Sequence, residues 1–190
     1  DLVFIRSLAT RNHPGGLMDC LTPMVDILSE CGWKNILIET VGAGQSEIRV
    51  VAFADRILLV DGPDRGDIIQ AEKAGIMELA DLIVINKSDL PEAERAAKAV
   101  KSALSVGEDE STPDVLMVSA HSGEGVEDLV DQLSNTTTSA DRERLRVRER
   151  LISAWDSALL TSPQLDDILQ ALEKGSITLQ EAVDRIRKEV

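Results

Sequence analysis

Four polar residues end an apolar run in the middle of the chain, and their types suit recognition of a purine base. The run is Leu82–Ile85, and Asn86, Lys87, Ser88 and Asp89 follow it directly. Guanine presents two donors, N1–H and the 2-amino group, which the carboxylate of Asp89 can accept together; adenine has no such pair. The amide of Asn86 can reach the base N7, and the stem of Lys87 can cover the ring. Charge-assisted hydrogen bonds of this kind contribute about 1.5–3 kcal/mol each.

These positions spell N-K-x-D, the guanine-specificity motif of GTPases, although a strand that merely ends in an Asx turn is the alternative. A later apolar run, "VLMVSAHSGEG", ends in Ser119 and Ala120, one strand–helix unit further on. The S-A pair carries little information alone. GTPases commonly have it at this point, with the backbone N–H of the alanine available to the base O6. Its position therefore favours a guanine nucleotide, GTP or GDP, as the ligand.

A third element could serve the phosphates and a metal ion. Glu39 ends the run "NILIE", and Gly42 follows three positions later, which is the layout of a Walker B or switch II segment. There the carboxylate holds Mg²⁺, usually through water, and the glycine N–H meets the γ-phosphate. Gln45 is a candidate for orienting water, with a solvent-facing loop glutamine as the alternative. Glu39, the predicted metal ligand, has the alternative of a plain strand-end carboxylate.

One part of a nucleotide hydrolase is missing from the sequence. No G-x-x-x-x-G-K-[ST] segment occurs in the 190 residues. That segment forms the loop whose backbone N–H groups and lysine hold the phosphates in P-loop NTPases. We therefore expect this polypeptide alone to bind nucleotide weakly and to hydrolyse it hardly at all. The first residue is Asp1, in a strand-like run, so we also expect that a segment in front has been lost.

The elements that must position these residues alternate along the chain. Four apolar runs are each followed by a polar or glycine-containing turn and a segment with helical spacing: "NILIETVGAG", "RILLVDGPDRG", "DLIVINKSD" and "DVLMVSAHSGEG". Continuous hydrophobicity predicts strands buried on both faces, and strand–helix alternation predicts a parallel sheet. Ligands of such sheets lie beyond the carboxyl ends of the strands, so the four turns should converge on one site.

Helical spacing predicts five helices around these strands and an all-helical C-terminal appendage. The five run over about Gly16–Cys31, Ser46–Ala54, Asp67–Leu79, Glu92–Leu104 and Val126–Leu133. After about residue 134, a polar linker leads into "DRERLRVRER", which we predict to be a solvated helix face with internal ion pairs. Two further helical stretches follow, with a glycine between them.

Composition and charge exclude several partners. The formal net charge is −14, whereas nucleic acids and anionic membranes bind basic patches. Two phenylalanines, two tryptophans and no tyrosine are too few rings for a surface that stacks single-stranded nucleic acid. Two cysteines cannot build a disulfide framework, and no apolar run approaches 18 residues. We therefore expect no nucleic-acid or membrane partner, and a reducing cytoplasm as the compartment.

Four stretches together resemble the MeaB/ArgK family of P-loop GTPases, the G-protein chaperones associated with methylmalonyl-CoA mutase. They are "FIRSLATRNHPGGL", "LIETVGAGQSE", "DGPDRGDIIQAEKAGIMELADLIVINKSDL" and "VSAHSGEGVEDL". The resemblance covers the whole chain, but family members carry their P-loop upstream of the position of Asp1. It implies an α/β fold, a parallel sheet flanked by helices. This would be an N-terminally truncated P-loop NTPase G domain in residues 1–134, with a helical dimerisation region in residues 135–190.

The resemblance also implies a function. It indicates a homodimeric, Mg²⁺-dependent GTPase that binds an adenosylcobalamin-dependent acyl-CoA mutase and gates its cofactor loading. Switch loops would lie at Glu39–Glu47 and at Asp61 to about Asp67. The second would communicate with the mutase, with an ordinary strand-to-helix connection as the alternative. The alternative is a non-catalytic module that dimerises through residues 141–190 and docks on a partner without turning over nucleotide. The missing P-loop favours that alternative for this chain, whereas the guanine and switch motifs favour a GTPase for the parent protein.

Overall fold

The computed structural model describes residues 3–8, 18–40, 53–63, 76–77, 79–105 and 112–187. The chain divides into two compact units, one of residues 38–149 and one of residues 1–37 together with 150–190. The first of these holds the sheet and the candidate site. The domain boundary at residue 134 stays a prediction.

Three parallel strands form the sheet in the order β1-β2-β3, with bounds β1 Leu58–Asp61, β2 Leu82–Ile85 and β3 Asp114–Met117. Each strand pairs with its neighbour over all four residues, so the three strands begin and end at the same level. The central strand β2 is buried at all four positions, as its continuous apolar run predicts, whereas β1 and β3 are partly exposed. The predicted α/β class with a parallel sheet flanked by helices is confirmed.

The first of the four predicted strands does not form. Residues 33–40, which contain the run "NILIE", are neither helix nor strand, and Leu37 is 96% exposed. Extended backbone becomes a strand only when its N–H and C=O groups pair with a neighbour, and no described strand pairs with this run. An apolar pattern predicts a strand but does not supply the neighbour that the strand needs.

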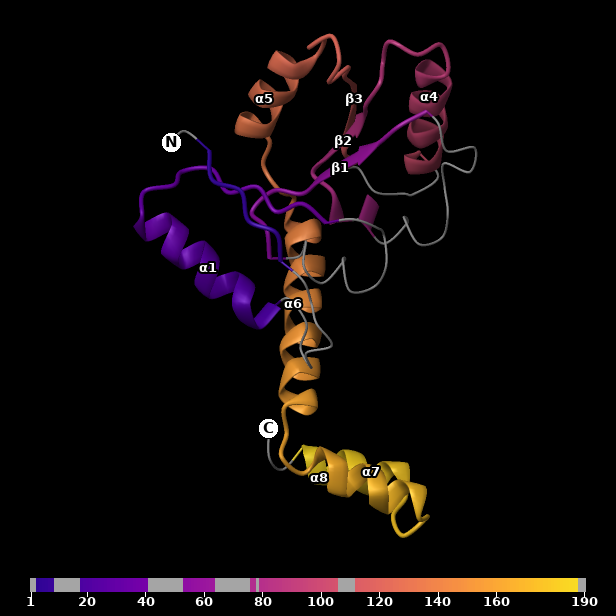
Figure 1. Cartoon of the computed structure of the whole chain (residues 1–190). Helices are drawn as coiled ribbons and strands as arrows, with labels where there is room; N and C mark the ends of the chain where they lie inside the picture. Colours follow the sequence, from indigo (N-terminus) through magenta and orange to yellow (C-terminus); the bar gives the residue numbers. More distant parts are fainter. Residues whose placement is uncertain are drawn as a thin grey trace. The chain divides into compact units, whose positions relative to one another are not determined.

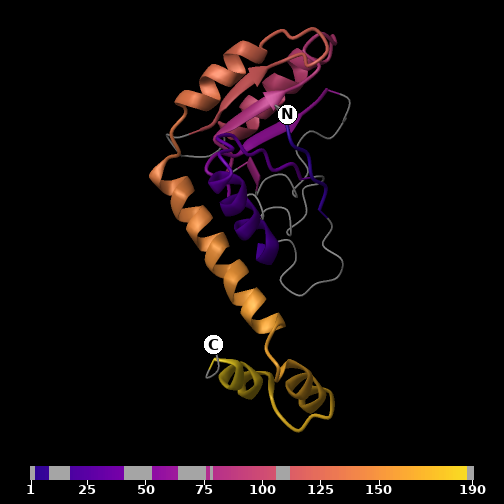
Figure 2. The ribbon, with the colours of Figure 1, turned by 60° about the vertical axis from the view of Figure 1, so that its left-hand side comes forward.

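Helices α4 (Ala93–Leu104) and α5 (Val126–Asn135) lie on opposite sides of the sheet (Figure 1 and Figure 2). The buried side chains of α4 have the spacing of one helix face and pack in the main hydrophobic core with Ile83 and Ile85 of β2. The helices predicted over 92–104 and 126–133 are confirmed. Those predicted over 46–54 and 67–79 lie mostly outside the described residues.

The second unit contains the ends of the chain. Helix α1 (Met18–Glu30) stops at Gly32, whose φ of 90° suits glycine. Helix α6 (Ala140–Leu160) starts in the sheet-bearing unit and continues into this one, and α7 (Leu165–Glu173) and α8 (Leu179–Ile186) follow it. The predicted helices at the C-terminus are confirmed. None of the helices in the described part of the chain has the length and apolar character needed to cross a membrane.

The prediction of a solvated face for the charge-rich start of α6 holds for one side only, where Arg148 is exposed and pairs with Glu149, and is wrong for the other side. Arg142 and Arg146 are buried, and both bond the buried carboxylate of Asp81. A run of alternating charges at helical spacing usually faces water. Here Asp81, which is 65 residues before Arg146 in the sequence, binds the arginines on one side of the helix.

Candidate functional site

The end of β2 places the N-K-x-D residues at the carboxyl edge of the sheet. The backbone N–H of Asn86 donates to the carbonyl of Asp61 at the end of β1, at 2.8 Å. Lys87 then has a φ of 59°, in the left-handed region, which turns the chain out of the sheet. The N–H of Ser88 donates to the carbonyl of Val118 at 3.1 Å, so the turn is held from both neighbouring strands.

The side chain of Asn86 joins this turn to the loop after β3. Its Oδ1 accepts from the N–H of Lys87 at 2.7 Å and from the N–H of Ala120 at 3.1 Å. Its amide nitrogen has no acceptor among the described residues, and it is therefore available to an acceptor such as a purine N7. The N–H of Ala120, predicted to meet the base O6, donates to Asn86 in this structure.

Asp89 is oriented by Ser119. The hydroxyl of Ser119 is completely buried and donates to Oδ1 of Asp89 at 2.5 Å. This hydroxyl, and next the backbone N–H of Asp89, hold the pKa of that carboxyl below its ordinary value, while slight burial opposes them. Electrostatic interactions with His121 and then Lys87 lower the pKa of Asp89 further. Asp89 is therefore an ionised acceptor at neutral pH.

The loop that carries Ser119 and Ala120 is closed by its own backbone. The N–H of Ser119 donates to the carbonyl of Glu124 at 2.9 Å, and that of Gly123 to the carbonyl of Ser119 at 2.8 Å. Gly125 has a φ of 75°, and a Cβ there would come within 2.6 Å of the carbonyl oxygen of Met117. Only glycine fits this position, so the loop has a defined path beside Asn86.

The predicted phosphate and metal residues are not assembled in the described part of the chain. Gly42 and Gln45 lie outside the described residues. Glu39 is exposed, in the stretch that forms no strand, and no hydrogen bond or ion pair among the described residues connects it to the Asn86–Asp89 cluster. Within the described residues, no three His, Cys, Asp or Glu side chains gather to hold a metal ion. For Mg²⁺ these residues supply one candidate carboxylate and no completed site.

Two neighbours of the site were not among the predicted base-binding residues. His121 lies close enough to Asp89 to influence its pKa, and Asp61 supports Asn86 through its backbone carbonyl. Their positions in the sequence carried a signal: His121 follows the S-A pair directly, and Asp61 ends the apolar run before N-K-x-D.

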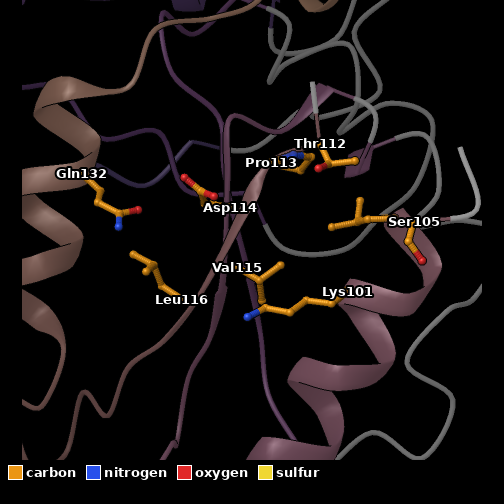
Figure 3. A pocket seen from close by; sticks show the side chains of 9 residues that line it. Lys101, Ser105, Thr112, Pro113, Asp114, Val115, Leu116 and Gln132 are labelled. Carbon is orange, nitrogen blue, oxygen red and sulfur yellow. The ribbon is translucent and has the colours of Figure 1, made fainter. Parts of the chain in front are cut away.

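A cavity of about 370 Å³ lies elsewhere in the same unit (Figure 3). It adjoins the first three residues of β3, with Lys101 and Ser105 at the end of α4 and Gln132 of α5 around it. Ser119 and Ala120 follow the opposite, carboxyl end of β3. The cavity is therefore separate from the candidate site.

Comparison with known proteins agrees with the sequence motifs. The family described as methylmalonyl Co-A mutase-associated GTPase MeaB matches residues 1–178. A Pyrococcus abyssi protein whose name describes a GTPase is 31% identical over 207 aligned residues, covering 99% of this chain and 64% of the relative. GTPase ArgK of Escherichia coli is 31% identical over 163 residues, covering 82% and 49%. The mitochondrial methylmalonic aciduria type A homolog of Mus musculus is 38% identical over 136 residues, covering 68% and 33%.

The relatives are longer than this chain. It spans 64%, 51% and 62% of the length of three relatives from Pyrococcus and Caulobacter. Their names describe GTPases.

Proposed function

Because the chain belongs to the MeaB family of methylmalonyl-CoA mutase-associated GTPases, we propose that its N-K-x-D and S-A residues bind the base of a guanine nucleotide. In this proposal Asp89 accepts from N1–H and the 2-amino group, and Asn86 donates to N7. Lys87 covers the ring, and the Ser119–Ala120 loop borders O6. The observation that supports it most is the cluster itself. The hydroxyl of Ser119 orients the carboxylate of Asp89, and the side-chain oxygen of Asn86 accepts from the N–H groups of Lys87 and Ala120, one in each loop.

The arrangement suits guanine rather than adenine for a physical reason. An ionised carboxylate accepts hydrogen bonds and donates none, so it needs a base edge with two donors. Adenine would bring the ring N1 acceptor against Asp89 and leave the charge without a partner. Ser119 prevents Asp89 from turning away, and its contribution to the low pKa keeps the carboxylate charged. In this proposal, the preference for guanine follows from the two hydrogen bonds that N1–H and the 2-amino group donate to Asp89.

We propose GTP hydrolysis as the activity of the longer protein. The chain lacks a phosphate-binding G-x-x-x-x-G-K-[ST] segment, so the phosphates need groups beyond these 190 residues. Glu39 is the proposed Mg²⁺ ligand, Gly42 the proposed contact of the γ-phosphate and Gln45 the proposed water-orienting residue. When bound, the metal would neutralise charge on the phosphates. Each residue of this chain would act by positioning and electrostatics.

The proposed partner is an adenosylcobalamin-dependent acyl-CoA mutase. The description of the family names a mutase association, and one relative is named for methylmalonic aciduria. The stretches Glu39–Glu47 and Asp61–Asp67 are the proposed switch loops. Asp61 is bonded to Asn86 through its backbone, so movement at the base site could reach the start of the second loop. Few cysteines make the cytoplasm the proposed compartment.

We propose that the protein is a homodimer that joins through its C-terminal helices. Val147, Leu151 and Trp155 follow one another at four-residue steps along α6, and all three are exposed. Replacing Leu151 with glutamate should put a charge into that stripe and shift the protein to monomer in sedimentation velocity. Lys98→Gln, at an exposed position of α4, changes the net charge by the same amount and is the matched control. A variant that stays dimeric would count against α6 as the interface.

A titration with labelled GDP and ADP in the presence of Mg²⁺ tests the base site. We expect GDP to bind about 10- to 100-fold more tightly than ADP, the amount that one or two charge-assisted bonds supply. Amide shifts of Lys87 and Ala120 in ¹H–¹⁵N spectra should report the contact. Asp114→Asn, at the other end of β3, is the matched control and should change nothing. Equal binding of the two nucleotides would refute the assignment, and no binding of either would favour the non-catalytic interaction module.

A further inference from the structure

A buried ionic cluster ties the start of α6 to the amino end of β2. Asp81 directly precedes β2; its Oδ2 accepts from Arg146 at 2.5 Å and from the N–H of Ile57 at 2.9 Å. Its Oδ1 accepts from Arg142 at 3.5 Å. The side chains of Asp81 and Arg146 are 0% and 1% exposed. The proposed nucleotide residues stand at the other end of the strand, so this cluster has no part in binding the base.

The guanidinium of Arg146 donates to four acceptors in three segments of the chain. Besides Asp81, it donates to the carbonyl of Leu79 at 2.9 Å and to that of Asp55 at 3.3 Å. It also donates to the hydroxyl of Thr138, just before α6, at 3.1 Å. The five donors of arginine form a rigid, planar fork. All these acceptors can be met together at one rotation and one axial position of the helix.

Apolar packing alone would not select that position. Residues 140–149 read "ADRERLRVRE", and Leu145 is their one side chain packed against the main described core. Hydrophobic contact is non-directional, so a helix held by one leucine could slide or rotate at small cost. A buried ion pair, in contrast, is a weak source of net stability, because desolvation offsets most of the attraction. Its best-attested use is to select one register over its alternatives.

We propose that Asp81, Arg142 and Arg146 form a register pin, which fixes the rotation and axial position of α6 on the sheet. The two arginines are four residues apart and share one helix face. At 100° per residue, Leu151 and Trp155 lie on the opposite side of α6. The pin therefore decides which face of α6 is turned outward. This last consequence rests on the proposed dimer, whereas the pin itself does not depend on it.

Spin-label distances within one chain test the pin. The labels go on Lys98→Cys in α4 and Arg144→Cys in α6, both exposed, in a background in which Cys20 and Cys31 are serine. Labelled chain is diluted with unlabelled chain and contains no nucleotide, so neither GDP binding nor dimerisation enters the result. The parent should give one narrow distance distribution.

The decisive variant replaces all three pin residues with apolar ones: Asp81→Leu, Arg142→Met and Arg146→Met. We expect it to keep its helix content and to give a broadened distribution or a second peak. An unchanged narrow peak would overturn the pin, because a role in stability alone predicts no change of register.

Arg146→Lys decides the question if the triple variant does not fold. It keeps the charge but replaces the fork with a single ammonium group, which cannot meet all the acceptors of Arg146. We expect a distribution at least twice as wide as that of the parent, and a width equal to the parent's would overturn the proposal. Arg148→Lys, on an exposed side chain of the same helix, is the matched control and should leave the width unchanged.

Discussion

Replacing Arg146 with methionine should lower the free energy of unfolding by about 3–5 kcal/mol, because it leaves the carboxylate of Asp81 buried without its main partner. Arg142 remains, but its contact with Asp81 is 3.5 Å long. Folded domains are stable by only about 5–15 kcal/mol in total, so this loss would be a large share. Urea unfolding followed by circular dichroism measures it.

The matched control is Arg148→Met. That side chain is 66% exposed and pairs with its neighbour Glu149, so we expect a change within about 0.5 kcal/mol. Replacing Asp81, Arg142 and Arg146 together by apolar residues should restore most of the loss, because no charge then stays buried. A loss below about 1 kcal/mol for Arg146→Met would show that Asp81 finds water or another partner. The ionic cluster would then contribute little to holding α6 in place.

Replacing Asp89 with asparagine should change which base the protein prefers. The amide cannot accept from both donors of guanine. GTP binding should therefore weaken by about 10- to 100-fold, which corresponds to the free energy of one or two charge-assisted hydrogen bonds. Xanthine has a carbonyl in place of the 2-amino group, and the amide NH₂ can donate to it. Xanthosine triphosphate should therefore bind the variant more tightly than it binds the parent.

The measurement needs tight binding, so it is best made in a longer chain that carries a phosphate-binding loop. Competition against labelled GDP gives both affinities in one series. Asp114→Asn removes a carboxylate at the far end of β3 and should leave both affinities as they are. Because the pKa of Asp89 is lowered, its charge is constant above about pH 5, and the parent's preference for GTP should not change between pH 6 and 8. An unchanged preference in Asp89→Asn would mean that this carboxylate does not read the base.

Strands and turns of the site were predictable because their signals are local. The run Leu82–Ile85 is continuously apolar and is buried throughout. The strand ends where the sequence changes from apolar to polar residues, at Asn86. The run before Ser119 also forms a strand and ends in a polar turn, although that strand is only partly buried. Parallel order then follows from strand–helix alternation, and parallel strands bring their carboxyl ends to one edge. That is why Ser119 and Asp89, 30 residues apart, could be expected near each other.

One prediction was wrong and another was wrong in part, and both concern partners that are distant in the sequence. The run "NILIE" has the composition of a strand, but pairing depends on a neighbour that composition cannot provide. The charges of "DRERLRVRER" have the spacing of a solvated helix, but two of its arginines meet Asp81 inside the protein. Both errors come from applying a local rule where a distant partner decided the outcome: none of the described strands pairs with the first run, and Asp81 binds the second.

Residue types and their order along the chain were enough to establish the family and the class of fold and to predict the base-recognition motif, because these depend on neighbours within a few positions. Folding in three dimensions settled the rest: that Ser119 orients the carboxylate of Asp89, that Asn86 holds two loops, and that α6 docks through charges. Those facts depend on which distant groups come within about 3 Å of one another. The free energy of burying a charge or a hydroxyl is set by that encounter and not by the residue alone.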